Sequence, residues 1–176
     1  ERTSIPIKTF QPTHVGRSAK LQDDAFRFAK MGGTIDITCG QSESKFKAVA
    51  ASLKKAAEEQ VPMEKITISS DGQGSWSNYD ADGKLTEMGV SDVDTIYRQI
   101  VYEVKNENMP LAEALTFGTS NVAKALELYP KKGAVQEGSD GDLLLMNGDL
   151  TLDAVIAGGA VMMKDGVLAK KGTYEK

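Results

Sequence analysis

Apolar runs alternate with amphipathic segments along the first two thirds of the chain. Runs rich in apolar and β-branched residues at 7–15, 34–38 and 66–70 predict three strands. Between them, residues 21–30 and 44–60 repeat apolar side chains every three or four positions, which predicts helices with one buried face. Strands that alternate with helices are typical of a parallel sheet, so we expect an α/β fold.

Each predicted helix has an apolar face that identifies its buried side. In the first helix, Leu21, Ala25 and Phe28 share one face, and Gly32-Gly33 follows as a stop signal. The apolar face of the second helix consists of Phe46, Val49, Ala50 and Leu53. We expect both faces to pack against the predicted sheet.

A polar stretch follows the third strand and runs to about residue 89, which predicts a long and functional loop. Ser91 and Asp94 resemble a capping box and predict the start of another helix. Its inner side is expected to carry Val93, Ile96, Tyr97, Ile100, Val101 and Val104. Two shorter helices should come next, one with Pro110 in its first turn.

The pattern changes at Gly133. Beyond it, short apolar runs are separated by glycine-containing turns, which is typical of antiparallel hairpins. These runs are residues 142–146, 153–156, 160–163 and 167–169. We therefore divide the chain into an α/β part, residues 1–132, and a small β-rich part, residues 133–176.

Composition narrows the class of function. The 176 residues carry 21 basic and 25 acidic side chains, and no cluster of Lys and Arg is interleaved with aromatic residues. This disfavours nucleic acid and a membrane surface as partners. No stretch approaches the ~18 apolar residues of a membrane span, and Cys39 is the only cysteine. We expect a soluble protein of the reducing cytoplasm without an intrachain disulfide.

Residues with catalytic chemistry stand at the ends of the predicted strands, where parallel α/β folds place their active sites. His14 and Arg17 follow the first strand: an imidazole can bind a metal or act as a general base, and a guanidinium can hold a carboxylate. Cys39 follows the second strand. Asp71 and Ser75 follow the third, as a candidate metal ligand or base and a hydrogen-bond donor. No glycine-rich phosphate-binding fingerprint follows any strand, which argues against nucleotide binding.

Each of these residues also has an ordinary structural interpretation. A lone histidine is more often a hydrogen-bonded part of the fold, Arg17 and Ser75 suit a solvated surface, and Cys39 suits a small buried position. Asp71-Gly72 is a standard hairpin signal, although the residues after it show no clear alternating return strand. The equivalent positions of His14 and Asp71 favour a shared metal site, but catalytic zinc takes about three protein ligands. The chain has no second histidine to complete it.

Four motifs together resemble the C-terminal part of the isoaspartyl (β-aspartyl) dipeptidases, a family of the amidohydrolase superfamily. The motifs are residues 12–17, 33–38, 69–75 and 171–175. A further segment, residues 133–144, resembles the passage of this superfamily into a small β-sandwich, with Gly141 where alanine is usual. The resemblance covers the whole chain. It implies the C-terminal part of a (β/α)8 TIM barrel, about strands 6–8, followed by strands of the small β-sandwich domain.

The resemblance also implies an activity and a site. The activity is hydrolysis of the β-aspartyl amide bond of dipeptides by a zinc metallopeptidase with two metal ions. By position, His14 matches a metal ligand, and Asp71 matches a metal ligand that is also the catalytic proton shuttle. Arg17 and Ser75 match positions that contact the isoaspartyl dipeptide substrate.

The remaining ligands of the two-metal centre have no counterpart in this sequence, and the chain begins with Glu1 rather than Met. We therefore expect a C-terminal half that is inactive alone and that requires the missing N-terminal portion of the same protein. The resemblance further implies a homo-oligomer. Two alternatives remain open: another amidohydrolase, of the dihydroorotase-like or N-acyl-amino-acid type, and a non-catalytic assembly fragment.

Overall fold

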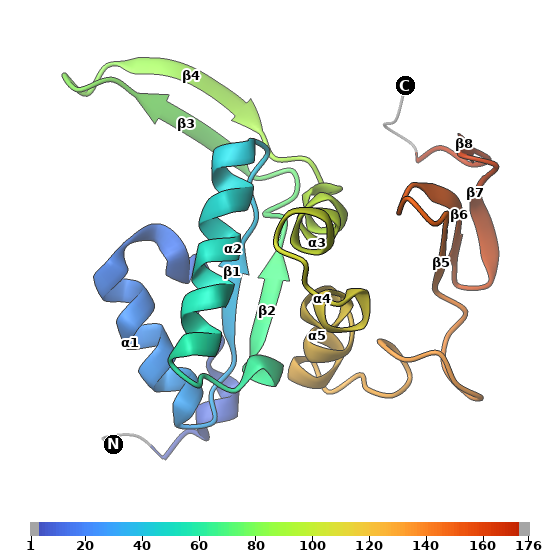
Figure 1. Ribbon diagram of the computed structural model, residues 1–176, viewed down its shortest axis with the longest axis horizontal. Helices are drawn as coiled ribbons and strands as arrows, with labels where there is room; N and C mark the ends of the chain where they lie inside the picture. Colours follow the sequence, from blue (N-terminus) through green and yellow to red (C-terminus); the bar gives the residue numbers. More distant parts are fainter. Residues whose placement is uncertain (1–3, 173–176) are drawn as a thin grey trace.

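The computed structural model describes residues 4–172, so most of the closing motif at 171–175 lies outside the described residues. Helices surround two short parallel strands, and antiparallel strands follow (Figure 1). In chain order the elements are η1 (Ile7–Thr9), η2 (Val15–Arg17), α1 (Ala19–Lys30), β1 (Ile35–Thr38), α2 (Glu43–Glu58), η3 (Met63–Lys65), β2 (Ile66–Ser69), β3 (Ser75–Tyr79), β4 (Leu85–Val90), α3 (Thr95–Asn106), α4 (Leu111–Gly118), α5 (Ser120–Ala125), β5 (Leu143–Met146), β6 (Leu152–Ala157), β7 (Ala160–Lys164) and β8 (Val167–Leu168). The elements labelled η are 3₁₀ helices.

Strands β1 and β2 are parallel neighbours, as their sequence pattern predicts. Ile35 lies opposite Ile66, and Thr38 lies opposite Ser69. The crossover between them contains α2, whose predicted apolar face is buried. Figure 1 places α1 on the β1 side of the pair and α4 and α5 on the β2 side. The carboxyl ends of both strands therefore open at the same edge, where the β3–β4 hairpin begins.

The strand expected at residues 7–15 is wrong. This segment contains η1 and the start of η2. The chain between them is joined to β1 by the backbone N–H of Asp36, which donates to the carbonyl of Pro12 over 2.9 Å. Proline explains the outcome, because Pro12 has no N–H to donate to a neighbouring strand. The expected three-strand barrel segment is thus a mixed α/β unit with two paired strands, and no closed barrel forms among residues 4–172.

Helix α1 is confirmed, and its buried face is partly the expected one. Ala25 is buried and Phe28 packs against the core, as predicted. The Ser18 hydroxyl accepts a hydrogen bond from the backbone N–H of Leu21, which caps the first turn. The buried residues are Ala25, Phe26 and Ala29, whereas Leu21 is 41% exposed. Two alanines let the helix approach the sheet closely, so that the Phe26 ring reaches the core. The predicted stop is confirmed, because the helix ends just before Gly32.

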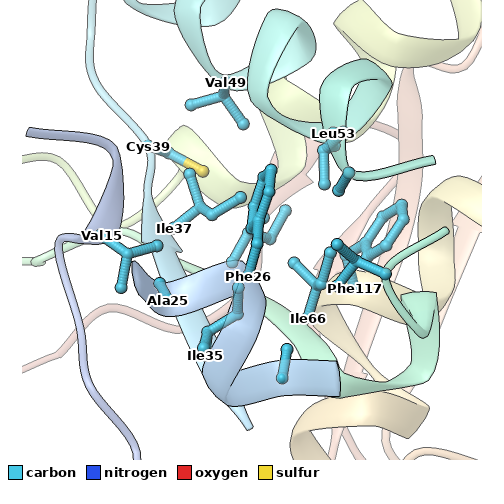
Figure 2. Packing of buried hydrophobic residues seen from close by; sticks show 14 of the residues in the cluster. Val15, Ala25, Phe26, Ile35, Ile37, Cys39, Val49, Leu53, Ile66 and Phe117 are labelled. Carbon is cyan, nitrogen blue, oxygen red and sulfur yellow. The ribbon is translucent and has the colours of Figure 1, made fainter. Parts of the chain in front are cut away.

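The apolar core lies between the helices and the two parallel strands. Figure 2 shows the Phe26 ring near the centre of this cluster, with Ile37 and Leu53 among its neighbours. Phe26, Leu53 and Phe117 are each 1% exposed. Side chains from α1, α2 and α4 therefore meet in one cluster that fixes the helices around the strands.

The polar stretch after β2 is an antiparallel hairpin rather than a long loop. Its turn is closed by Asp80, whose carbonyl accepts from Gly83 N–H and whose carboxylate accepts from the backbone N–H of Asp82 and Lys84. Gly83 has a φ of 78°, which glycine adopts without strain. Asp71-Gly72, for which a hairpin turn and a functional role were both left open, does not join two paired strands, because β2 pairs with β1 and β3 pairs with β4.

Helix α3 begins at Thr95, later than the capping-box motif at Ser91 predicts. Ile100 is buried and Ile96 and Val104 pack against the core, as predicted, whereas Val93 is 65% exposed. The inner side is more polar than expected, because its other buried residues are Thr95, Gln99 and Glu103. The expected capping box is wrong, because the Asp94 side chain makes no capping hydrogen bond. Both shorter helices, α4 and α5, are confirmed, although Pro110 precedes the first turn of α4.

Glu103 is a buried carboxyl group without a cation against it in the described residues. It accepts a 2.6 Å hydrogen bond from the Gln99 side-chain amide, which also donates to the carbonyl of Phe46. Burial raises the pKa of Glu103 to about 7, the negative charge of Glu107 adds to this rise, and the Gln99 hydrogen bond opposes it. The fold therefore favours the protonated form of Glu103.

We expect Glu103→Gln to flatten the dependence of stability on pH. The pKa of Glu103 is about 7 in the folded chain against 4.5 in the unfolded reference, so its contribution is full below pH 4.5 and is lost as pH rises through 7. Thermal unfolding between pH 5 and 8 measures this effect, which is about 2 to 4 kcal/mol. Glu113→Gln, an exposed control on α4, should keep the wild-type pH dependence. A Glu103→Gln profile that falls as steeply as wild type would contradict the assignment.

The four C-terminal strands that were predicted are confirmed. They form one antiparallel sheet in the order β5-β6-β7-β8, which lies apart from the parallel strands in Figure 1. The second sheet of a sandwich does not occur among residues 4–172. Within the same residues, no helix has the length and apolar character needed to cross a membrane.

Candidate active site

A cavity of about 550 Å³ lies at the carboxyl end of β1. Its walls come from η2, the segment that joins β1 to α2, the first turns of α2, and the β3–β4 hairpin. Three of the four predicted site residues line it: His14, Arg17 and Asp71. Ser75 does not line it, but Ser77 does, two positions along the same face of β3. The fold thus brings most of the predicted residues to one place.

The imidazole of His14 is held in one orientation. Its Nδ1 lies 2.8 Å from the Thr38 hydroxyl, at the last position of β1. His14 itself has a φ of 57°, in the left-handed region that few non-glycine residues adopt. This backbone conformation turns the chain from the extended segment into η2. The hydrogen bond on Nδ1 leaves Nε2 as the ring nitrogen that is free to bind a metal ion.

Asp71 has the same unusual backbone conformation, with a φ of 51°. The next residues fold back against it, because the backbone N–H of Gly74 donates to the Asp71 carbonyl over 2.8 Å. A Cβ atom at Gly74 would lie 2.8 Å from that carbonyl oxygen and 2.9 Å from the carboxylate Oδ1, so a larger residue does not fit there. Backbone strain of this kind persists where the surrounding structure fixes it, and it occurs often at active sites.

The cavity combines charges of both signs. Arg17 and Lys45 contribute cationic groups, and Asp71 and Glu87 contribute carboxylates. Such a lining suits a small zwitterionic ligand with more than one carboxylate.

The hairpin wall of the cavity contains residues that the sequence analysis missed. Trp76, Asn78 and Glu87 line the cavity, and the buried indole Nε1 of Trp76 has no hydrogen-bond partner within residues 4–172. The Gln41 side-chain amide donates to the carbonyl of Val90 over 2.9 Å, which fastens the hairpin to the segment after β1. The Asp-Ala-Asp-Gly turn at residues 80–83 is the sequence signal that identifies this hairpin.

Cys39 belongs to the core, as its ordinary interpretation predicts, and also borders the cavity. It is 6% exposed, and burial raises the pKa of its thiol to about 12, with the nearby charges of Asp36 and Glu103 adding to the rise. At neutral pH the side chain is therefore a protonated thiol, which is a weak nucleophile and a poor metal ligand.

Two residue types that can bind a metal ion meet at the cavity. No group of three or more His, Cys, Asp and Glu side chains with metal-binding spacing occurs within residues 4–172. His14 and Asp71 offer an imidazole and a carboxylate at one cavity, and both are ligand types that zinc accepts. These two residues fit the role of partial ligands, with the other ligands coming from elsewhere.

Comparison with known proteins gives matches over nearly the whole chain. Residues 13–168 match the model of the amidohydrolase family. A crystal structure of β-aspartyl dipeptidase from Fervidobacterium islandicum AW-1, in complex with the β-Asp-Leu dipeptide, matches 98% of this chain with 34% identity and a TM-score of 0.85. A second structure of that dipeptidase matches with a TM-score of 0.79 and the same identity, again over 98% of this chain.

The matched chains are longer than this one. The chain spans 44% of the first dipeptidase structure and 42% of the second. Enamidase, a member of the amidohydrolase superfamily, matches 97% of this chain with a TM-score of 0.62, and the chain covers 48% of it. At 16% identity, the enamidase match shows similarity of fold alone.

Proposed function

Because this chain belongs to the amidohydrolase family, we propose that it is the C-terminal half of a β-aspartyl dipeptidase that hydrolyses the isoaspartyl amide bond. The observation that carries the proposal is the arrangement of His14, Arg17 and Asp71 around one cavity, in a chain that is 34% identical to a dipeptidase bound to β-Asp-Leu. The remainder of the active site would come from the N-terminal portion of the same protein.

His14 and Asp71 are the residues that would hold zinc in this proposal, and other ligands of a two-zinc centre would come from the N-terminal portion. The chemistry that a divalent cation supplies at such a site is polarisation of the scissile carbonyl and of the attacking water. Thr38 supports the assignment because its hydroxyl fixes the His14 ring through Nδ1.

Asp71 is the proposed proton carrier. One carboxylate oxygen accepts the proton that the attacking water loses, and the same group then donates it to the nitrogen of the leaving amine. The turn that closes on the Asp71 carbonyl fixes the backbone from which the carboxylate extends at the cavity wall.

Arg17 is the proposed substrate anchor. A β-aspartyl dipeptide has two free carboxylates, and a guanidinium can bind one of them through two parallel hydrogen bonds. Ser75 remains a proposed substrate contact, on the β3 face that it shares with Ser77. We also propose that the protein assembles as a homo-oligomer and acts in the cytoplasm.

The test is hydrolysis of β-Asp-Leu by the full-length protein, with its N-terminal portion included. The isomer α-Asp-Leu is the control substrate. We expect cleavage of the β isomer only, and Arg17→Met should raise KM about 10 to 100-fold with a smaller change in kcat, because it removes a charged hydrogen-bonded anchor. Arg27→Met is the matched control, since Arg27 is exposed on α1 and pairs with Asp24. Turnover of dihydroorotate or an N-acyl amino acid in place of β-Asp-Leu would instead indicate another amidohydrolase.

A further inference from the structure

Asp36 is a buried carboxylate beneath the proposed metal site. It occupies the second position of β1 and is 6% exposed. Three hydroxyl groups donate hydrogen bonds to it: those of Thr13, Thr67 and Ser69. Both carboxylate oxygens are used, Oδ2 by Thr13 at 2.8 Å and Ser69 at 2.5 Å, and Oδ1 by Thr67 at 2.8 Å.

Stability alone does not account for an acidic residue at this position. None of the ion pairs within residues 4–172 involves Asp36. Removal of a carboxylate from water is costly, and hydrogen bonds from neutral hydroxyls offset only part of that cost. An apolar residue at this position, packed against apolar partners in place of the three hydroxyls, would avoid that desolvation cost. A functional role for the negative group would explain its presence.

The hydrogen bonds of Asp36 connect the two segments that end in the proposed ligands. Thr13 immediately precedes His14, and Ser69 stands two positions before Asp71. Both hydroxyls bind the same oxygen, so one atom joins the two chain segments. The backbone N–H of Asp36 adds a bond to the Pro12 carbonyl, also in the His14 segment.

The same face of β1 also orients the His14 ring. Thr38 lies two positions after Asp36, and alternate residues of a strand point to the same side. Its hydroxyl is the group within 2.8 Å of His14 Nδ1. Asp36 and Thr38 thus lie two positions apart on one face of β1. Asp36 holds the chain segment before His14, and Thr38 holds the His14 ring.

We propose that Asp36 is a positioning residue that sets the spacing of His14 and Asp71 for a divalent cation through its hydrogen bonds to Thr13 and Ser69. The inference rests on the proposed function for the existence of the metal site. Asp36 itself is not proposed as a ligand, because it does not line the cavity that His14 and Asp71 share.

The experiment measures zinc affinity of the protein as encoded, by competition with a chromophoric chelator. Asp36→Asn keeps the size of the side chain and should weaken zinc binding about 10 to 100-fold, the range found for groups that orient metal ligands. Thr13→Val and Ser69→Ala each remove one bond and should each weaken it by a smaller factor. Cobalt(II) replaces zinc in a second measurement, in which the three variants should shift the visible absorption bands of the bound ion.

Thr95→Val is the matched control. It removes a hydroxyl from a fully buried threonine at the start of α3, where the bond goes to the carbonyl of Asp92 and involves neither Asp36 nor the cavity. We expect it to lower the thermal unfolding midpoint about as much as Ser69→Ala does, while zinc affinity stays within about twofold of wild type, because the link between the ligand-bearing segments is intact.

The outcomes separate the inference from the proposed function. Tight zinc binding by wild type with unchanged affinity in Asp36→Asn, Thr13→Val and Ser69→Ala overturns the positioning role and leaves the function standing. Losses of affinity that follow the losses of stability equally in all four variants, Thr95→Val included, also overturn it, since a purely structural role predicts that relation. Absence of zinc binding in wild type overturns both.

Discussion

Asp71→Asn is expected to lower turnover of β-Asp-Leu by about 10²- to 10⁴-fold, the usual contribution of a positioned acid or base. Asparagine has nearly the same shape, so it can occupy the turn that Gly74 closes, but its amide cannot carry a proton from water to the leaving amine. The loss should fall on kcat more than on KM, because the proton transfers occur in the chemical step. Steady-state kinetics of the protein as encoded measures both constants.

Asp82→Asn is the matched control for this experiment. The substitution is the same, but Asp82 lies in the exposed turn of the β3–β4 hairpin and does not line the cavity. Its kinetic constants should equal those of wild type. Near-normal kcat in a folded Asp71→Asn protein would remove Asp71 from the proton-transfer role, whatever the substrate.

Phe26→Ala is expected to destabilise the folded protein by about 3 to 5 kcal/mol, the usual cost of removing a large aromatic side chain from a core. The Phe26 ring is 1% exposed and lies among side chains from the parallel strands and from α2, as Figure 2 shows. Neighbouring groups belong to short strands and cannot all move in to fill the space. Urea denaturation of wild type and variant gives the difference in the free energy of unfolding.

Phe10→Ala removes the same ring from a different environment. Phe10 is 43% exposed, so its loss should cost no more than about 1 kcal/mol. An equal loss for both variants would mean that the cluster around Phe26 does not support the fold.

Periodicity predicted the regular elements that bury one continuous face. The apolar stripe of α2 was identified because its buried residues recur every three or four positions. Strands β1 and β2 were identified from their short runs of β-branched residues. The first expected strand failed for a local reason, since Pro12 removes a donor that a strand needs. Helix α1 was found, but a choice between Phe26 and Phe28 as the buried ring depends on packing across the sheet, which no local pattern contains.

Three of the predicted site residues lie together because the segments that carry them end at one edge of the parallel strands. His14, Arg17 and Asp71 line one cavity, although the segment before His14 is not a strand, and their roles stay predictions. The hairpin residues Trp76 and Glu87 were missed because the stretch was interpreted as a loop. Asp36 gave no signal at all, since an acidic residue that alternates with isoleucines is the usual pattern of a half-exposed strand.

The buried thiol of Cys39 offers a way to measure local opening of the protein beside the cavity. Because the sulfur lies in the core beside the cavity and remains protonated at neutral pH, a thiol reagent can react with it only while this part of the protein is open. The rate of labelling then depends on how often this part of the protein opens. Cys39 is the sole cysteine of this sequence, so its labelling rate reports how often the wall behind the candidate active site opens. The same rate, measured with a β-aspartyl dipeptide added, tests whether that ligand slows the opening.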